Sequence, residues 1–92
     1  MYENRWAILD GSLFTDRQTA HEILKKELCL PAYYGKNLDA LYDCLTEMGK
    51  TEIDLFSCAM IRRSLSAYGD KLLQVFEDAA RANSNLTLKM FD

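Results

Sequence analysis

Arg5-Trp6-Ala7-Ile8-Leu9-Asp10-Gly11 is the stretch of sequence that decides the fold. Its apolar residues are consecutive, and the Asp10-Gly11 pair that closes the run is a turn signal. A short run of this kind is typical of a strand that is covered on both faces, as in a parallel sheet. Because it is the most uniformly apolar strand candidate in the chain, we expect it at the centre of the sheet of an α/β protein.

The residues after this strand predict two helices. Thr15-Asp16-Arg17-Gln18 has the form of a capping box, and apolar residues at helical spacing follow it. Pro31 cannot continue a helix, so the first helix should end near Leu28–Cys29. Asn37 is a good N-cap for a second helix that runs to about Leu45, and the residues between the two helices should form a loop.

The second half of the chain predicts further helices and strands. Residues 51–55 alternate between polar and apolar, as in a half-covered strand. Residues 58–65 and 70–82 have helical spacing, and the alternation over residues 86–90 predicts a closing strand. Strands separated by helical crossovers form a parallel sheet. We therefore expect a single domain over residues 1–92, with a small three-stranded parallel sheet packed with about four helices.

The composition excludes several classes of protein. Of the 92 residues, 49% are hydrophobic and 27% are charged, which is typical of one globular domain and not of a disordered chain. The formal net charge of -3 disfavours a protein that binds nucleic acid directly and suits a cationic partner. No apolar run is long enough for a signal peptide or a membrane helix. We therefore expect a cytoplasmic protein that makes no membrane contact and is a monomer when free.

The cysteine and histidine content disfavours a metal site and an enzyme. Cys29, Cys44 and Cys58 contain no CxxC pair, so we expect reduced structural thiols and no bound metal or other cofactor. His21 is the single histidine, and we interpret it as a solvated side chain on the surface of the first helix. The chain lacks GxGxxG, phosphate-loop and HExxH motifs. Gly69, like the glycine at position 35, should mark a turn or a helix end.

The second predicted helix carries an unusual acidic face. Asp39 and Asp43 lie four residues apart and therefore project from the same side, with Thr46 on that face and Tyr42 beside it. Like charges at this spacing cost an isolated helix ~0.2–0.5 kcal/mol. The helix dipole compensates Asp39 in the first turn but does not compensate Asp43.

Two adjacent aromatic residues, Tyr33 and Tyr34, precede this helix. An acidic face framed by tyrosines is typical of an interaction site, because aromatic residues concentrate in the centres of interfaces. The pattern alone equally suits a solvated helix face, with one of the tyrosines covering the edge of the sheet.

Residues 25–46 resemble a known protein family. Their core, LPAYYGKNLDALYDCLT over residues 30–46, resembles the barstar family of small intracellular inhibitors of barnase-type ribonucleases. Weaker similarity runs through residues 73–79 and the final strand, and residues 48–69 are the least alike. The resemblance implies a three-stranded parallel sheet packed with helices.

The resemblance also implies a site and a mechanism. In this family the second helix and the loop before it enter the cationic active site of the ribonuclease. Asp43 then takes the place of an RNA phosphate, Asp39 is a second acidic contact, and Tyr33 packs on the catalytic histidine of the enzyme. The full set of partner-binding positions that we carry over is Tyr33, Tyr34, Gly35, Asn37, Asp39, Tyr42, Asp43, Thr46 and Asp78.

Three functions remain open at this point. We expect an inhibitor of a ribonuclease, acting as an immunity protein or antitoxin. Glu47 and Met48 stand where the family has a Gly-Trp pair, so the target could differ from barnase, and a toxin ribonuclease of another fold would also fit. A non-inhibitory module that binds another basic protein is the alternative. A hydrolase built on Asp39 and Asp43 is disfavoured, because exposed carboxylates rarely have the shifted pKa that acid–base catalysis needs.

Overall fold

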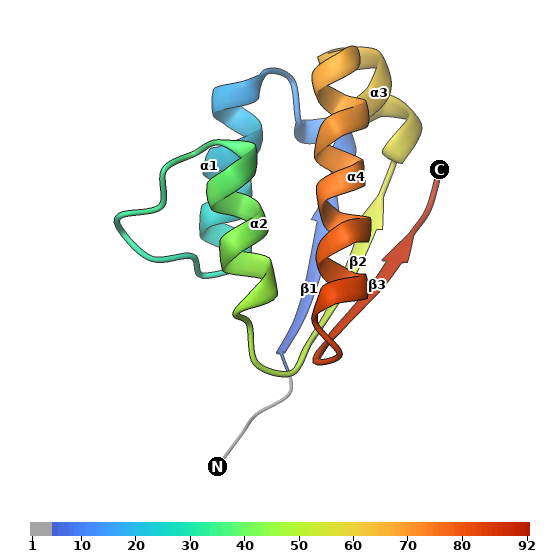
Figure 1. The fold of residues 1–92 in the computed structure, drawn as a ribbon. Coiled ribbons are helices and arrows are strands. Elements are labelled where there is room, and N and C mark those ends of the chain that lie inside the picture. Colours follow the sequence, from blue (N-terminus) through green and yellow to red (C-terminus); the bar gives the residue numbers. More distant parts are fainter. Residues whose placement is uncertain (1–4) are drawn as a thin grey trace.

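The computed structural model describes residues 5–92 and shows one sheet packed with helices (Figure 1). Along the chain the elements are β1 (Arg5–Asp10), the short 3-10 helix η1 (Gly11–Leu13), α1 (Arg17–Glu27), α2 (Leu38–Thr46), β2 (Thr51–Phe56), α3 (Cys58–Leu65), α4 (Ala67–Ala82) and β3 (Leu86–Met90). All strand pairs are parallel. The prediction of a small α/β fold with three parallel strands and four helices is confirmed.

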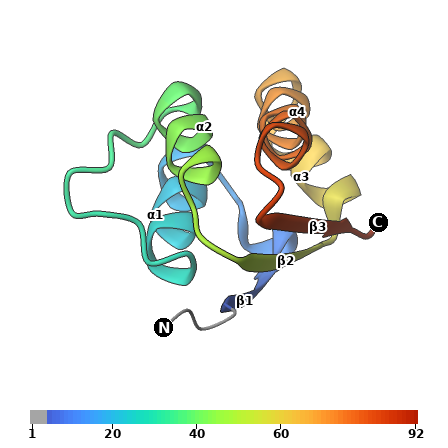
Figure 2. The same ribbon diagram turned by 60° about the horizontal axis from the view of Figure 1, so that its bottom comes forward.

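The strand order is β1-β2-β3, so the prediction that the first strand is central is wrong. β2 occupies the centre and buries Ile53 and Leu55 completely. β1 lies at an edge, where Trp6 and Ile8 are 67% and 54% exposed. Figure 2 shows α1, α2 and α4 packed on the same face of the sheet. Trp6 and Ile8 alternate along β1 with the buried Leu9, so they belong to the opposite face. A consecutive apolar run therefore does not require that a strand be covered on both faces.

On the open face of the sheet, which is the face opposite α1, α2 and α4, side chains of neighbouring strands contact one another. Trp6 Nε1 donates a hydrogen bond of 2.9 Å to Asp54 Oδ2 on the central strand, and Asp54 is itself buried. Phe56 and Phe91 stack with their ring centroids 4.7 Å apart. These contacts explain how apolar side chains remain ordered on a face that no helix covers.

Capping residues set the helix starts. The side chain of Asp16, and not that of Thr15, caps α1 by accepting from the Thr19 backbone N–H at 2.8 Å. The N-cap therefore lies one residue later than predicted, and the predicted capping box of Thr15 and Gln18 is not formed. Asn37 caps α2 as predicted and accepts from the Ala40 backbone N–H at 2.8 Å.

α4 begins three residues earlier than the pattern predicts, because Gly69 lies inside the helix and not at its end. Gly69 is buried, and a Cβ at this position would lie 2.5 Å from the backbone oxygen of Ile61 in α3. The missing side chain therefore lets two consecutive helices approach closely.

Two of the cysteines contribute to packing. Cys58 is buried in the core, Cys44 is half-buried against it, and Cys29 is exposed. All three are free thiols. Within residues 5–92, none of the helices has both the length and the apolar character needed to cross a membrane.

Candidate functional site

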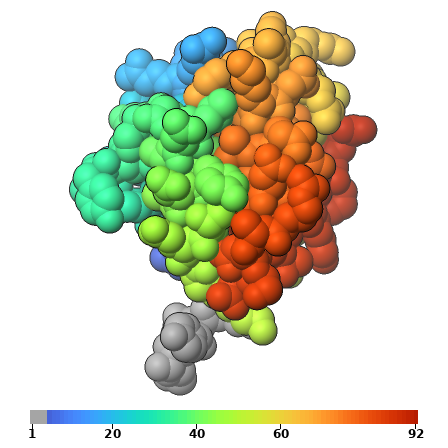
Figure 3. All heavy atoms as spheres, in the orientation of Figure 1, coloured from blue at the N-terminus to red at the C-terminus, as the bar shows by residue number. Residues whose placement is uncertain are grey.

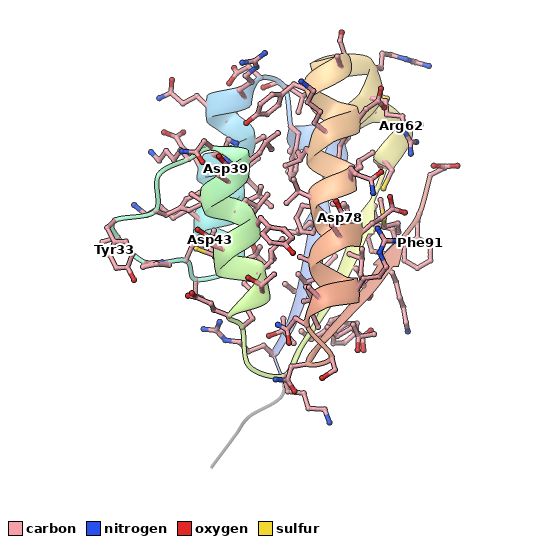
Figure 4. All side chains as sticks on the ribbon, viewed as in Figure 1. Tyr33, Asp39, Asp43, Arg62, Asp78 and Phe91 are labelled. Atoms are coloured by element: carbon pink, nitrogen blue, oxygen red, sulfur yellow. The ribbon has the colours of Figure 1, made fainter. Side chains whose placement is uncertain are left out.

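The exposed side of α2 carries both aspartates. Leu41 and Leu45 anchor the opposite side in the core with no exposed surface. Asp39 and Asp43 are exposed, and Figure 4 shows them one above the other along the helix. Packing of the two leucines therefore fixes the direction in which both carboxylates project. We call Asp39 and Asp43 the acidic face.

The acidic face is not neutralised by the chain itself. Within residues 5–92 neither Asp39 nor Asp43 forms an ion pair, although other carboxylates of the protein do. Asp43 gains nothing from the helix dipole, since it lies beyond the first turn. Both carboxylates therefore lack a cationic partner among the described residues, and Asp43 also lacks the compensation that the helix dipole gives Asp39, so the acidic face can bind a cation of another molecule.

Asp78 differs from these two aspartates. It lies on α4, which packs beside α2, and its carboxylate pairs with Arg81 and accepts a 2.9 Å hydrogen bond from Gln74. Figure 4 shows it on the same side of the molecule as the acidic face. The structure therefore brings Asp78 near the site, but with its charge already paired.

Thr46, Asn37 and Gly35 have local partners. The Thr46 hydroxyl donates to the backbone oxygen of Asp43 at 3.0 Å and so steadies the end of α2. The Asn37 side-chain amide donates to the backbone oxygen of Gly35 at 3.4 Å while its oxygen caps the helix. A Cβ at Gly35 would lie 3.2 Å from Asn37 Nδ2, so a larger residue would disturb this capped corner.

The tyrosine loop, residues 28–37 between α1 and α2, presents one aromatic ring outward and one inward. Tyr33 is 88% exposed and stands at the tip of the loop in Figure 4. Tyr34 is buried and packs in the core, although it also lines the hollow beside α2, and its predicted contact with a partner stays a prediction. Tyr42 on α2 is partly exposed, at the margin of the acidic face.

His21 holds the buried tyrosine, and the prediction that it is a solvated surface residue is wrong. It is only 1% exposed, and its Nδ1 lies 2.6 Å from the Tyr34 hydroxyl. Its Nε2 lies 2.7 Å from the Tyr68 hydroxyl on α4. The missed signal is its spacing, because His21 lies three and seven residues before the buried Leu24 and Leu28 on the apolar stripe of α1.

The environment keeps this pair uncharged. Burial lowers the pKa of His21 below its usual range, and the positive charge of Lys36 lowers it further. Burial raises the pKa of Tyr34, with smaller contributions from Cys44 and Tyr68.

A hollow of about 600 Å³ separates the tyrosine loop from the lower part of α2. Tyr33 lines it from the loop, and Asp43 and Glu47 line it from the helix side. Burial raises the pKa of the Cys44 thiol in its wall, and the negative charges of Glu47 and Asp43 raise it further. In Figure 3 the loop projects beside α2. The structure thus joins an exposed aromatic ring and two carboxylates at one concave site. Arg5 also lines the hollow, so the two carboxylates outnumber one cation and the site still suits a cationic group.

Comparisons with known proteins agree with this geometry. A family model described as Barstar (barnase inhibitor) matches residues 4–91. The chain is also 38% identical over 77 residues to a Bacillus subtilis (strain 168) protein named "Putative ribonuclease inhibitor YrdF". The match spans 82% of this chain and 85% of that protein.

Proposed function

Because this chain belongs to the barstar family, we propose that it inhibits a ribonuclease by placing the acidic face and the tyrosine loop in the cationic active site of the enzyme. One observation supports this most directly. Asp39 and Asp43 are exposed and unpaired within residues 5–92, beside an exposed Tyr33. A ribonuclease active site holds arginine, lysine and histidine groups that grip phosphate, and a carboxylate can occupy the same positions.

Each exposed residue has a part in this proposal. Asp43, which lines the hollow, takes the place of the phosphate, and Asp39 binds a second basic group one turn away. Tyr33 packs on an imidazole ring or a planar guanidinium group of the enzyme. Tyr42 and Asp78 lie farther out and act at the margin of the contact.

The buried and capped residues act indirectly. Asn37 and Gly35 hold the junction between loop and helix, and Thr46 holds the last turn of α2. Tyr34 supports the loop from the core. The inhibitor would act in the cytoplasm of the cell that makes the ribonuclease, as an immunity protein or antitoxin, and would need no cofactor.

Asp43→Ala tests the proposal. We expect binding to barnase to weaken by about 2–5 kcal/mol of free energy, which raises Kd. This is the range for truncating one partner of a desolvated charge pair, of which the barnase–barstar complex is itself an example. Titration calorimetry and an RNA-hydrolysis assay would measure the change. Asp70→Ala is the matched control, since Asp70 is an exposed aspartate of α4 that pairs with Arg62.

Two outcomes would contradict the proposal. Equal losses in Asp43→Ala and Asp70→Ala would remove the acidic face from the contact. A wild-type chain that inhibits neither barnase nor the ribonucleases of its own cell, yet binds another basic protein, would favour the non-inhibitory module.

A further inference from the structure

His21 joins three parts of the chain behind the binding surface. It lies on α1, its Nδ1 meets Tyr34 of the tyrosine loop at 2.6 Å, and its Nε2 meets Tyr68 of α4 at 2.7 Å. Arg17 covers the Tyr68 ring, with its guanidinium carbon 4.3 Å from the ring centroid. Tyr34 directly follows the exposed Tyr33, so this hydrogen bond holds the loop at the residue next to its exposed aromatic ring.

The donor and acceptor roles follow from burial. A neutral imidazole has one N–H donor and one acceptor nitrogen. Tyr34 is buried, and its hydroxyl hydrogen has no other described acceptor, so it donates to Nδ1. Nε2–H then donates to Tyr68, which is half-buried and lines a hollow of about 420 Å³ that also contacts His21. The loop is therefore held by a hydrogen bond to Nδ1, which is the nitrogen that gains a proton when the imidazole becomes an imidazolium.

The charges around His21 oppose its protonation. Lys36 in the loop is the main charged neighbour, and it is 3.7 Å from Glu22 of α1. Arg17 of α1 lies across Tyr68, and on α2 the titratable neighbour of Tyr34 is the Cys44 thiol. In acid, Nδ1 would gain a proton, and Tyr34 would have to turn its hydroxyl from donor to acceptor with its hydrogen left unpaired.

We propose that His21 is a positioning residue that fixes the tyrosine loop for nuclease binding, and that acid releases this loop and weakens inhibition. The inference rests on the proposed function for its consequence in the complex. The anchoring of the loop itself is a property of the free chain and can be tested without a partner.

The first test follows the free chain. ¹⁵N NMR of the His21 ring should show the Nε2–H tautomer at about pH 8 and the imidazolium in acid, with a midpoint below the ordinary 6.5 because burial lowers the pKa. The amide signals of residues 32–36 should shift with the same midpoint as the ring, whereas those of β2 should not. Loop amides that do not follow the ring, or an Nδ1–H tautomer, would overturn the proposal even if the chain inhibits a different nuclease.

The second test measures dissociation from barnase for wild type and Tyr34→Phe. Loss of one buried hydrogen bond should raise koff about fivefold to tenfold at about pH 8. This ratio should fall toward one at the acid pH where the ring spectra show the imidazolium, because the wild type then loses the same bond. Because both proteins are measured with the same enzyme, the titration of the enzyme affects both koff values and cancels in their ratio. A ratio that stays constant with pH would overturn the proposal.

Two further variants separate positioning from general stability. Ile53→Val weakens the core at the central strand and should leave the koff of the folded protein unchanged. Tyr68→Phe removes the partner of Nε2 and should shift the midpoint of the loop titration without touching the loop. If Ile53→Val raises koff as much as Tyr34→Phe does, or if Tyr68→Phe leaves the midpoint unchanged, the positioning role is rejected.

Discussion

Tyr33 and Tyr34 are neighbours with opposite environments, and His21 is bonded to the buried one of the two. Tyr34 is 6% exposed and Tyr33 is 88% exposed. The hydrogen bond to His21 satisfies the buried hydroxyl of Tyr34, which would otherwise lose its bond to water on burial. Of the two tyrosines, only Tyr33 is left largely open to a partner.

The buried histidine predicts a pH dependence of stability. Since burial lowers the pKa of His21 from its ordinary 6.5, the unfolded chain binds this proton more readily than the folded chain. The free energy of unfolding should therefore decrease as the pH falls below about 6.5, and this decrease should end once the folded form is also protonated. Urea titrations across this range would measure it.

His21→Gln is the control for this prediction, because it removes the titrating group. The variant should be less stable at neutral pH, and its stability should vary less between about pH 7 and about pH 5. Hydrogen bonds lower the pKa of Asp10 and Asp16 below 3.8, so their contribution is lost only in stronger acid and does not overlap. An unchanged slope in His21→Gln would refute the assignment.

At the scale of elements, periodicity predicts which segments are helices and strands but not how they pack. The extents of α1, α2, β2, α3 and β3 agree with the predicted ones to within about a residue or two. The position of β1 could not be derived, because an exposed Trp6 bonded to Asp54 has the same local pattern as a buried residue. The close approach of the α3 backbone to Gly69 could not be predicted either, because nothing in the sequence around Gly69 indicates it.

Gly69 and Gly49 predict opposite effects of the same substitution. Gly69→Ala improves helix propensity, yet its Cβ would meet the Ile61 backbone oxygen at 2.5 Å. We expect a net destabilisation of about 1–3 kcal/mol, since backbone atoms cannot move aside. Gly49→Ala meets nothing within 4 Å and should stabilise the protein by about 0.4–1 kcal/mol. Thermal or urea unfolding of both variants would decide, and a stabilised Gly69→Ala would disprove the tight crossing.

At the scale of the whole molecule, the sequence predicted part of the candidate site correctly, whereas it did not predict the order of the strands. Helical spacing alone places Asp39 and Asp43 on one exposed side, and the structure agrees. The hollow that joins Asp43 to Tyr33 and the pairing of Asp78 with Arg81 could not be derived, because both depend on how the loop and α4 lie against α2.

The acidic surface predicts how association depends on salt. The chain has a net charge of -3 and its acidic face is unpaired within residues 5–92. Its association rate with a cationic nuclease should fall as salt rises from ~0.1 M to ~1 M, where the Debye length shrinks from about 10 Å to about 3 Å. Stopped-flow mixing would measure this rate, and barnase with barstar is itself the established example of such steering.

Asp39→Asn/Asp43→Asn should have a slower association rate that responds less to salt. Asp70→Asn, which neutralises a paired charge on α4, serves as the comparison. An equal salt response in both variants would mean that overall charge, and not the acidic face, guides the encounter.

The open face of the sheet has a practical consequence for spectroscopy. The chain contains one tryptophan, Trp6, and it lies on the side of the sheet opposite α2. Its emission should respond when the strands separate but should stay constant when another protein occupies the helical side. Any change in indole fluorescence on mixing would then originate in the added protein, so Trp6 reports on the folding of this chain and does not report on its complexes.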